Sequence, residues 1–95
     1  RGLIMDLDEL KQFLKVDGND LDVVLIGYQA AAEQYLANAG VTINYTNALY
    51  KVVVSMIVGT FLENPNLVAS SGNMDGLSMT IGSLIAQLRL SQVTL

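Results

Sequence analysis

The stretch from Ala48 to Glu63 limits the folds open to this chain more than any other. Thr46 or Asn47 can cap a helix at its start, and Pro65 stops one just after its end. On a helical wheel, the polar positions fall on one line, four residues apart: Lys51, Ser55, Gly59 and Glu63. A helix that is apolar on nearly every side is usually buried on every side. We expect this helix to be enclosed, and we expect a chain this short to wrap it incompletely.

Ionised side chains are scarce outside the first quarter of the sequence. Charged residues make up 15% of the 95 residues, against about 25% in an ordinary domain. Beyond Asp22 the charged residues are Glu33, Lys51, Glu63, Asp75 and Arg89. One interpretation is a compact helical monomer with few surface charges. The other is a subunit covered by copies of itself, because depletion of charge marks the cores of interfaces. The composition favours the second.

A short first helix is predicted from its capping signals. Asp6 is the expected N-cap, and Glu9, three residues later, completes a capping box. Its apolar stripe consists of Leu7, Leu10 and Leu14, and Gly18 is the expected stop signal.

A long second helix is predicted from Asn19 or Asp20 to about Ala39, closed by Gly40. Its core stripe at helical spacing consists of Leu21, Val24, Leu25, Tyr28, Ala31, Ala32, Tyr35, Leu36 and Ala39. The opposite face carries a second, smaller apolar stripe of Val23, Ile26, Gly27, Ala30 and Ala37. We expect this second stripe to meet another subunit.

The remaining segments complete an all-α fold. Residues 41–45 alternate apolar and polar side chains with β-branched residues, which predicts a short extended segment that could form an arm. Residues 67–77 predict a long loop, and a last helix runs from about Ser78 to Leu90. Its inward residues are Ile81, Leu84, Ile85 and Leu88. Residues 1–95 are therefore predicted to form a single domain, a small bundle of about four helices.

The residue inventory offers no catalytic, cofactor-binding or metal-binding group. The chain has no His and no Cys, which removes the commonest bases, nucleophiles and transition-metal ligands. The acidic run of residues 17–22 lacks the glycine position and the closing Glu of a calcium loop, so helix capping explains it better. We expect no enzymatic activity, no cofactor and no metal.

The net charge of −4 and the pI near 4.3 argue against a protein that grips nucleic acid. Phosphate binding needs clustered Lys and Arg, whereas an acidic wall repels a passing phosphate backbone. The longest apolar run, Val52–Leu62, is shorter than the about 20 residues that span a bilayer. No signal peptide is visible at residues 1–5, so a cytosolic location away from membranes is expected.

These patterns resemble the head-to-tail connector (head completion) family of tailed bacteriophages and prophages. That family opens with a Leu-x-Glu-Leu-Lys-x-Leu-Leu helix and an acidic Asp-Gly-Asp turn. The corresponding residues here are Leu7, Glu9, Leu10, Lys11, Leu14, Asp17, Gly18 and Asp20. Residues 61–64 match the aromatic-x-Glu-x end of its third helix, and residues 84–89 match the Leu-Leu/Ile pair before an Arg in its last helix. The chain departs from the family at Asn64–Pro65, where Arg often stands, and at Leu77–Ser78, where Pro is common.

The resemblance implies an all-α subunit that assembles into a closed ring, of the 12-fold class, beneath the portal protein. Such a ring lies at the head-tail interface of the virion, while its free subunits are in the host cytoplasm. It extends the channel through which DNA passes without specific binding, and it docks a stopper or tail completion protein.

Two sets of residues are expected to make these contacts. The subunit interface is expected at Val23, Ile26, Ala30, Val54, Val58 and Leu62. Contacts to the partner proteins are expected from the loop residues Val41, Ile43, Tyr45, Leu67 and Met74. The alternative function, from a different class, is a small acidic helical adaptor or regulator that acts as a homodimer.

Overall fold

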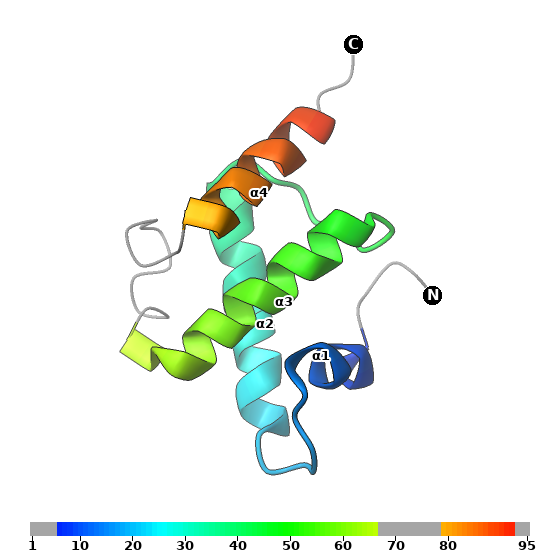
Figure 1. Ribbon diagram of the computed structural model, residues 1–95, viewed down its shortest axis with the longest axis vertical. Helices are drawn as coiled ribbons and strands as arrows, with labels where there is room; N and C mark the ends of the chain where they lie inside the picture. The colour runs from blue at the N-terminus through cyan, green and yellow to red at the C-terminus, as the bar shows by residue number, and fades with distance from the viewer. Residues whose placement is uncertain (1–5, 67–78, 93–95) are drawn as a thin grey trace.

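The computed structural model describes residues 6–66 and 79–92, which form four α-helices and no strand. In chain order these are α1 (Leu7–Leu14), α2 (Asp22–Asn38), α3 (Ala48–Glu63) and α4 (Met79–Ser91) (Figure 1). The prediction of a small all-α bundle is confirmed. Most of the loop predicted before the last helix lies outside the described residues.

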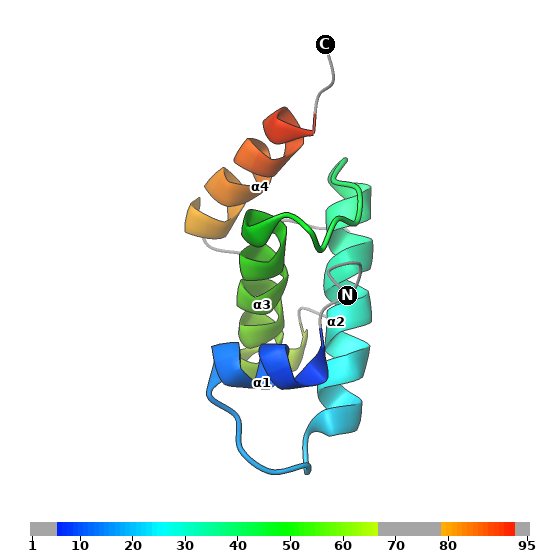
Figure 2. The same ribbon diagram turned by 90° about the vertical axis from the view of Figure 1, so that its right-hand side faces the viewer.

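α3 is the central helix, and α1, α2 and α4 all pack against it (Figures 1 and 2). Its buried side chains are Tyr50, Val53, Val54, Ser55, Ile57, Val58 and Phe61. Tyr28 of α2 meets Phe61 edge-on, with ring centroids 5.8 Å apart. The other three helices cover α3 from different sides but not completely, because Leu49, Val52, Met56 and Leu62 stay partly exposed.

α1 packs against the polar side of α3, which carries Lys51, Ser55 and Gly59. A Cβ atom on Gly59 would stand 3.2 Å from Cδ2 of Leu14, so the missing side chain lets α1 lie close. Ser55 is buried, and its hydroxyl donates to the carbonyl oxygen of Lys51 at 2.9 Å. The Lys51 ammonium reaches back to the Glu9 carboxylate of α1 at 3.0 Å. The first helix thus covers the side of α3 that has the least apolar bulk.

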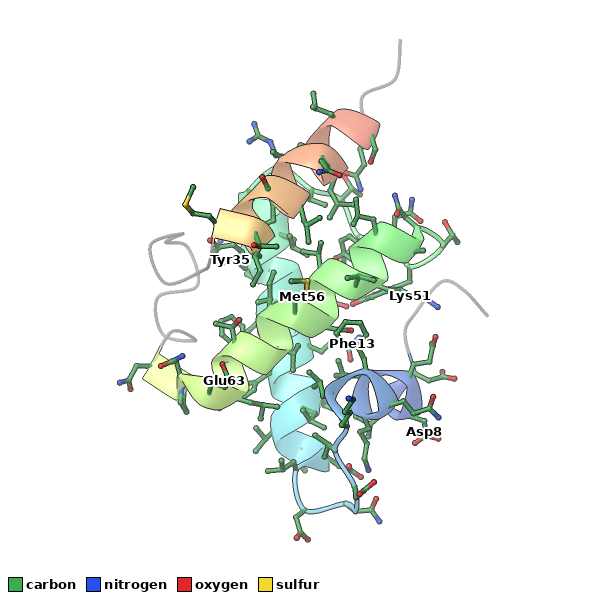
Figure 3. All side chains as sticks on the ribbon, in the orientation of Figure 1. Asp8, Phe13, Tyr35, Lys51, Met56 and Glu63 are labelled. Carbon is green, nitrogen blue, oxygen red and sulfur yellow. The ribbon has the colours of Figure 1, made fainter. Side chains whose placement is uncertain are left out.

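The start of α1 agrees with its sequence signals. Both halves of the capping box are present, and the Asp6 N–H donates to the Glu9 carboxylate at 3.3 Å. Asp8, in the first turn, points away from the bundle (Figure 3). The acidic residues there face the positive end of the helix dipole, which favours them.

The end of α1 differs from the expectation at Gly18. Lys15 takes the left-handed conformation, with φ of 59°, that glycine usually supplies at a helix end. The Val16 N–H donates to the Lys11 carbonyl at 2.9 Å, and the Lys15 N–H to the Gln12 carbonyl at 3.2 Å. Gly18, with φ of 77°, serves the turn that follows. The helix stops before Gly18 because Lys15 already satisfies its last carbonyls.

The turn between α1 and α2 is held by one lysine. The Lys11 ammonium contacts the Asn19 side-chain oxygen at 3.2 Å and the Asp22 carboxylate at 2.8 Å. α2 begins only at Asp22, later than predicted, because the residues before it form this turn. At its other end, Gly40 is in the left-handed region with φ of 89°, which confirms it as the closing residue.

Asn47 caps α3, as predicted, because its side-chain oxygen accepts from the Leu49 N–H at 2.8 Å. The segment before it, residues 41–46, is not helical, but it is no arm. Val41 and Tyr45 are buried in the core. The Gln92 amide pairs with the backbone N–H and C=O of Thr42 at 2.8 and 2.9 Å. The segment is therefore held in place by its buried side chains and by hydrogen bonds to Gln92 at the end of α4.

Replacing Lys15 with Gly is expected to stabilise the fold. A left-handed residue with a Cβ costs about 1–2 kcal/mol, and the extra freedom of glycine in the unfolded chain returns about half of that. We expect Lys15→Gly to raise the free energy of unfolding by about 0.5–1 kcal/mol, measured by urea denaturation. Gln12→Gly, in the exposed body of α1, is the matched control and should lower it by a similar amount. A destabilised Lys15→Gly variant would contradict the assignment of this helix end.

Candidate protein-interaction surfaces

The expected subunit-interface residues fall into two groups. Val54 and Val58 are fully buried within the chain's own core, so their assignment to an interface is wrong. They are covered because α3 is enclosed by its own chain. Leu62 is half-buried and packs against this core. Val23, Ile26 and Ala30 instead lie exposed on α2.

The exposed side of α2 is largely apolar, although it also carries the exposed side chains of Gln34 and Asn38. We call Val23, Ile26, Gly27, Ala30 and Ala37 the α2 outer face; all five are exposed. Val23 is 83% and Ile26 56% exposed. They lie opposite the side of α2 that buries Leu25, Ala32, Tyr35 and Leu36. A helix normally turns a polar side to water, so this face is suited to contact with protein.

A second apolar stripe lies on α4. We call Met79, Ser83, Ala86 and Leu90 the α4 outer face; these exposed residues recur every three or four positions along the helix. Met79 is 92% and Leu90 74% exposed. The sequence analysis predicts which residues of this helix face the core, but it does not predict the exposed apolar residues on its other side. The signal was present, because Met79 and Leu90 fall on the side opposite Ile81, Ile85 and Leu88.

The two outer faces point in different directions. In Figure 2, α2 runs along the right of the molecule and α4 lies at its upper left. Each helix buries its inner side against the core and turns its outer face away from it. The chain therefore offers two separate apolar surfaces, and not one continuous patch.

Of the loop residues expected to meet partner proteins, three lie in the described part of the chain, and two of these three are buried. Val41 and Tyr45 are buried, so the prediction that they make external contacts is wrong. They are drawn inward because α2 and α3 would otherwise leave the end of the core open. Ile43 lies between them in sequence and is 52% exposed. Leu67 and Met74 lie outside the described residues.

Tyr45 of this segment and Tyr50 of α3 form a buried tyrosine pair. The Tyr45 hydroxyl donates to the Glu33 carboxylate and accepts from the Gln29 amide at 3.2 Å. Burial, and then the hydrogen bond to Glu33, raise the pKa of Tyr45 well above its usual range. The Tyr50 ring packs edge-on against Tyr45, with centroids 5.0 Å apart. Burial and the nearby charge of Glu33 raise the pKa of Tyr50 to about 12.

These contacts join the segment of residues 41–46 to α2 and α3. The Tyr50 hydroxyl is buried and has no hydrogen-bond partner within the described part of the chain. In residues 6–66 and 79–92, no three Asp, Glu, His or Cys side chains gather in a way that could hold a metal ion. Over the same residues, no helix has the length and apolar character needed to cross a membrane. The apolar outer faces are thus the strongest functional feature of the described residues.

Comparisons of the chain with protein-family models, curated proteins and solved structures gave no match.

The two tyrosines are expected to respond differently to loss of their hydroxyl. Tyr45→Phe removes the hydrogen bond to a carboxylate and should lower the free energy of unfolding by about 1–3 kcal/mol. Tyr50→Phe removes a buried hydroxyl that has no partner among the described residues, so it should be neutral or slightly stabilising. Urea denaturation at pH 7 measures both. A Tyr50→Phe variant as unstable as Tyr45→Phe would show that the Tyr50 hydroxyl has a partner.

Alkaline pH gives an independent check on Tyr50. A tyrosine in the unfolded chain loses its proton near pH 10, whereas the native Tyr50 keeps its proton up to about pH 12. The unfolded state therefore binds fewer protons in this window, and stability falls as the pH rises from about 10 to about 12. The Tyr50→Phe variant should lose less stability over this range than the parent chain.

A charge placed on α3 is expected to lower the free energy of unfolding strongly, whereas a charge placed on the outer side of α2 should change it little. Val58→Asp buries an unpaired carboxylate and should cost more than about 4 kcal/mol, which unfolds a domain of this size. Ile26→Asp changes an exposed position and should leave the free energy of unfolding within about 0.5 kcal/mol of the parent. Circular dichroism with thermal unfolding distinguishes the two. A folded Val58→Asp variant would contradict the burial described above.

Proposed function

We propose that this chain is a structural subunit of the head-tail connector of a tailed phage or prophage. In this role it forms a closed ring beneath the portal protein, extends the DNA channel and docks a stopper or tail completion protein. The observation that carries the proposal is the pair of separate apolar faces on α2 and α4. The resemblance of the helix signatures to the connector family supports the same conclusion.

Two different faces suit a ring better than a simple dimer. A two-fold dimer uses the same patch on both subunits, and one apolar face is sufficient for it. Head-to-tail association joins one face to a different face on the next copy, and it closes into a ring when the rotation permits. The homodimeric adaptor therefore leaves one of the two outer faces without a role.

The charge distribution supports passage of DNA without binding. The exposed residues of α1 and of the following turn include Asp8, Asp17 and Asp20. Two of the nearby cations, Lys11 and Lys51, are taken up in ion pairs with Asp22 and Glu9. A surface of this kind repels phosphate, in contrast to the clustered Lys and Arg of DNA-binding proteins.

Negative-stain electron microscopy tests the proposal directly. The purified chain is imaged alone and after co-expression with the portal protein of the phage or prophage that encodes it. We expect closed rings, either free or stacked on the portal, and light scattering should give a mass of many subunits. A mass that stays at one or two subunits, with no density added to the portal, would contradict the connector role. A stable dimer without portal binding would favour the adaptor.

A further inference from the structure

We infer that the α4 outer face of one copy packs against the α2 outer face of the next copy. The inference deepens the proposed function and rests on it in one respect, because the ring supplies a second copy as the partner. It goes further by naming the two helices that meet and by excluding pairings of like faces.

The two faces are comparable in length, and both contain small residues. Met79 and Leu90 are eleven positions apart and span about 16 Å along α4, whereas Val23 and Ala37 span about 21 Å along α2. The larger side chains of the α4 face, Met79 and Leu90, lie at its two ends, whereas those of the α2 face, Val23 and Ile26, lie at its N-terminal end. Ser83 and Ala86 supply the small residues on α4, and Gly27 and Ala30 supply them on α2. Small residues allow two helix axes to approach closely, so each face can receive the other along its length.

A shallow groove continues the α4 outer face toward the end of α2. It is lined by Gly40, Ala86, Arg89 and Leu90. A Cβ atom on Gly40 would stand 3.7 Å from Nε of Arg89, so the glycine keeps the groove open beside Arg89. An aliphatic side chain such as Val23 or Ile26 of a neighbouring copy has the size and apolar character to fill it.

Charge distinguishes the possible pairings. The only charged residues of α2 are Asp22 and Glu33, and the only charged residue of α4 is Arg89. Arg89 is exposed, and it forms no ion pair with any residue that the structure describes. Glu33 accepts from Tyr45 but faces no cation in those same parts of the chain.

It follows that only the mixed pairing brings opposite charges together. Asp22 already pairs with Lys11, so two α2 helices would bring together only the Glu33 carboxylates as charges without a cation, and two α4 helices would bring together guanidinium groups alone. The contact between α4 and α2 instead allows Arg89 of one copy to approach Glu33 of the next. Opposite charges beside an apolar contact set its partner and register more than its strength.

The absence of cysteine makes this contact testable by cross-linking. The chain contains no Cys, so each introduced thiol is unique. Ala30→Cys and Ala86→Cys both alter exposed positions in the middle of an outer face, and neither should disturb the fold. The two variants are mixed, oxidised and separated on a non-reducing gel. Gln12→Cys, exposed on α1, replaces either partner as the matched control.

We expect a disulfide-linked dimer from the mixture at a yield well above that of either variant alone. The control mixtures should give only the background of random collision. Arg89→Glu, added to the Ala86→Cys variant, should reduce the yield about two- to fivefold, while Arg89→Lys should preserve most of it. No cross-link in the mixture, or an equal yield from Ala30→Cys alone, would overturn the α4–α2 contact.

The double variant carrying Ala30→Cys and Ala86→Cys in one chain separates this inference from the connector role. A ladder of linked chains is expected, because each copy then carries both halves of the contact. Such a ladder without portal binding would keep the α4–α2 contact and contradict the connector. Rings on the portal without a ladder would keep the connector and contradict the contact.

Discussion

The whole structure depends on the enclosure of α3. This helix is too apolar to face water, and the chain is short, so every other helix is used to cover it. The covering is arranged by small local features. Gly59 lets α1 approach, Ser55 turns its hydroxyl back to its own helix, and Lys51 reaches Glu9 across the seam. The cost of this arrangement is that α2 and α4 each bury one side only.

The scarcity of charge is therefore explained differently from our expectation. The sequence predicts that the chain wraps its central helix incompletely, but the partly exposed residues of α3 (Leu49, Val52, Met56 and Leu62) are not among the large apolar side chains that are exposed. The uncovered apolar surface lies instead on the outer helices, where Val23 and Met79 are among the most exposed side chains. The low charge content is therefore still consistent with contacts to other proteins, but through residues of α2 and α4 and not through α3.

Local signals predicted the helices well. Asp6 with Glu9, Asn47 and Gly40 act within a few residues of their own position, and each marks a helix end as expected. Lys15 was missed because a lysine carries no sign that it will adopt a left-handed conformation. Val54 and Val58 were misplaced for another reason. A wheel shows which residues share a side of a helix, but it does not show whether that side meets the same chain or another copy. Burial of Val41 and Tyr45 likewise depends on packing between distant helices.

The two hydrogen bonds between the Gln92 amide and the Thr42 backbone limit how α4 can move relative to α2. They join the end of α4 to the segment that leaves α2, so the two outer helices are tied together at one end as well as through α3. The angle between them is then a fixed property of each copy. In the ring proposed above, that angle would be repeated at every step and would set the curvature, so the Gln92 side chain would help to decide how many copies complete a circle.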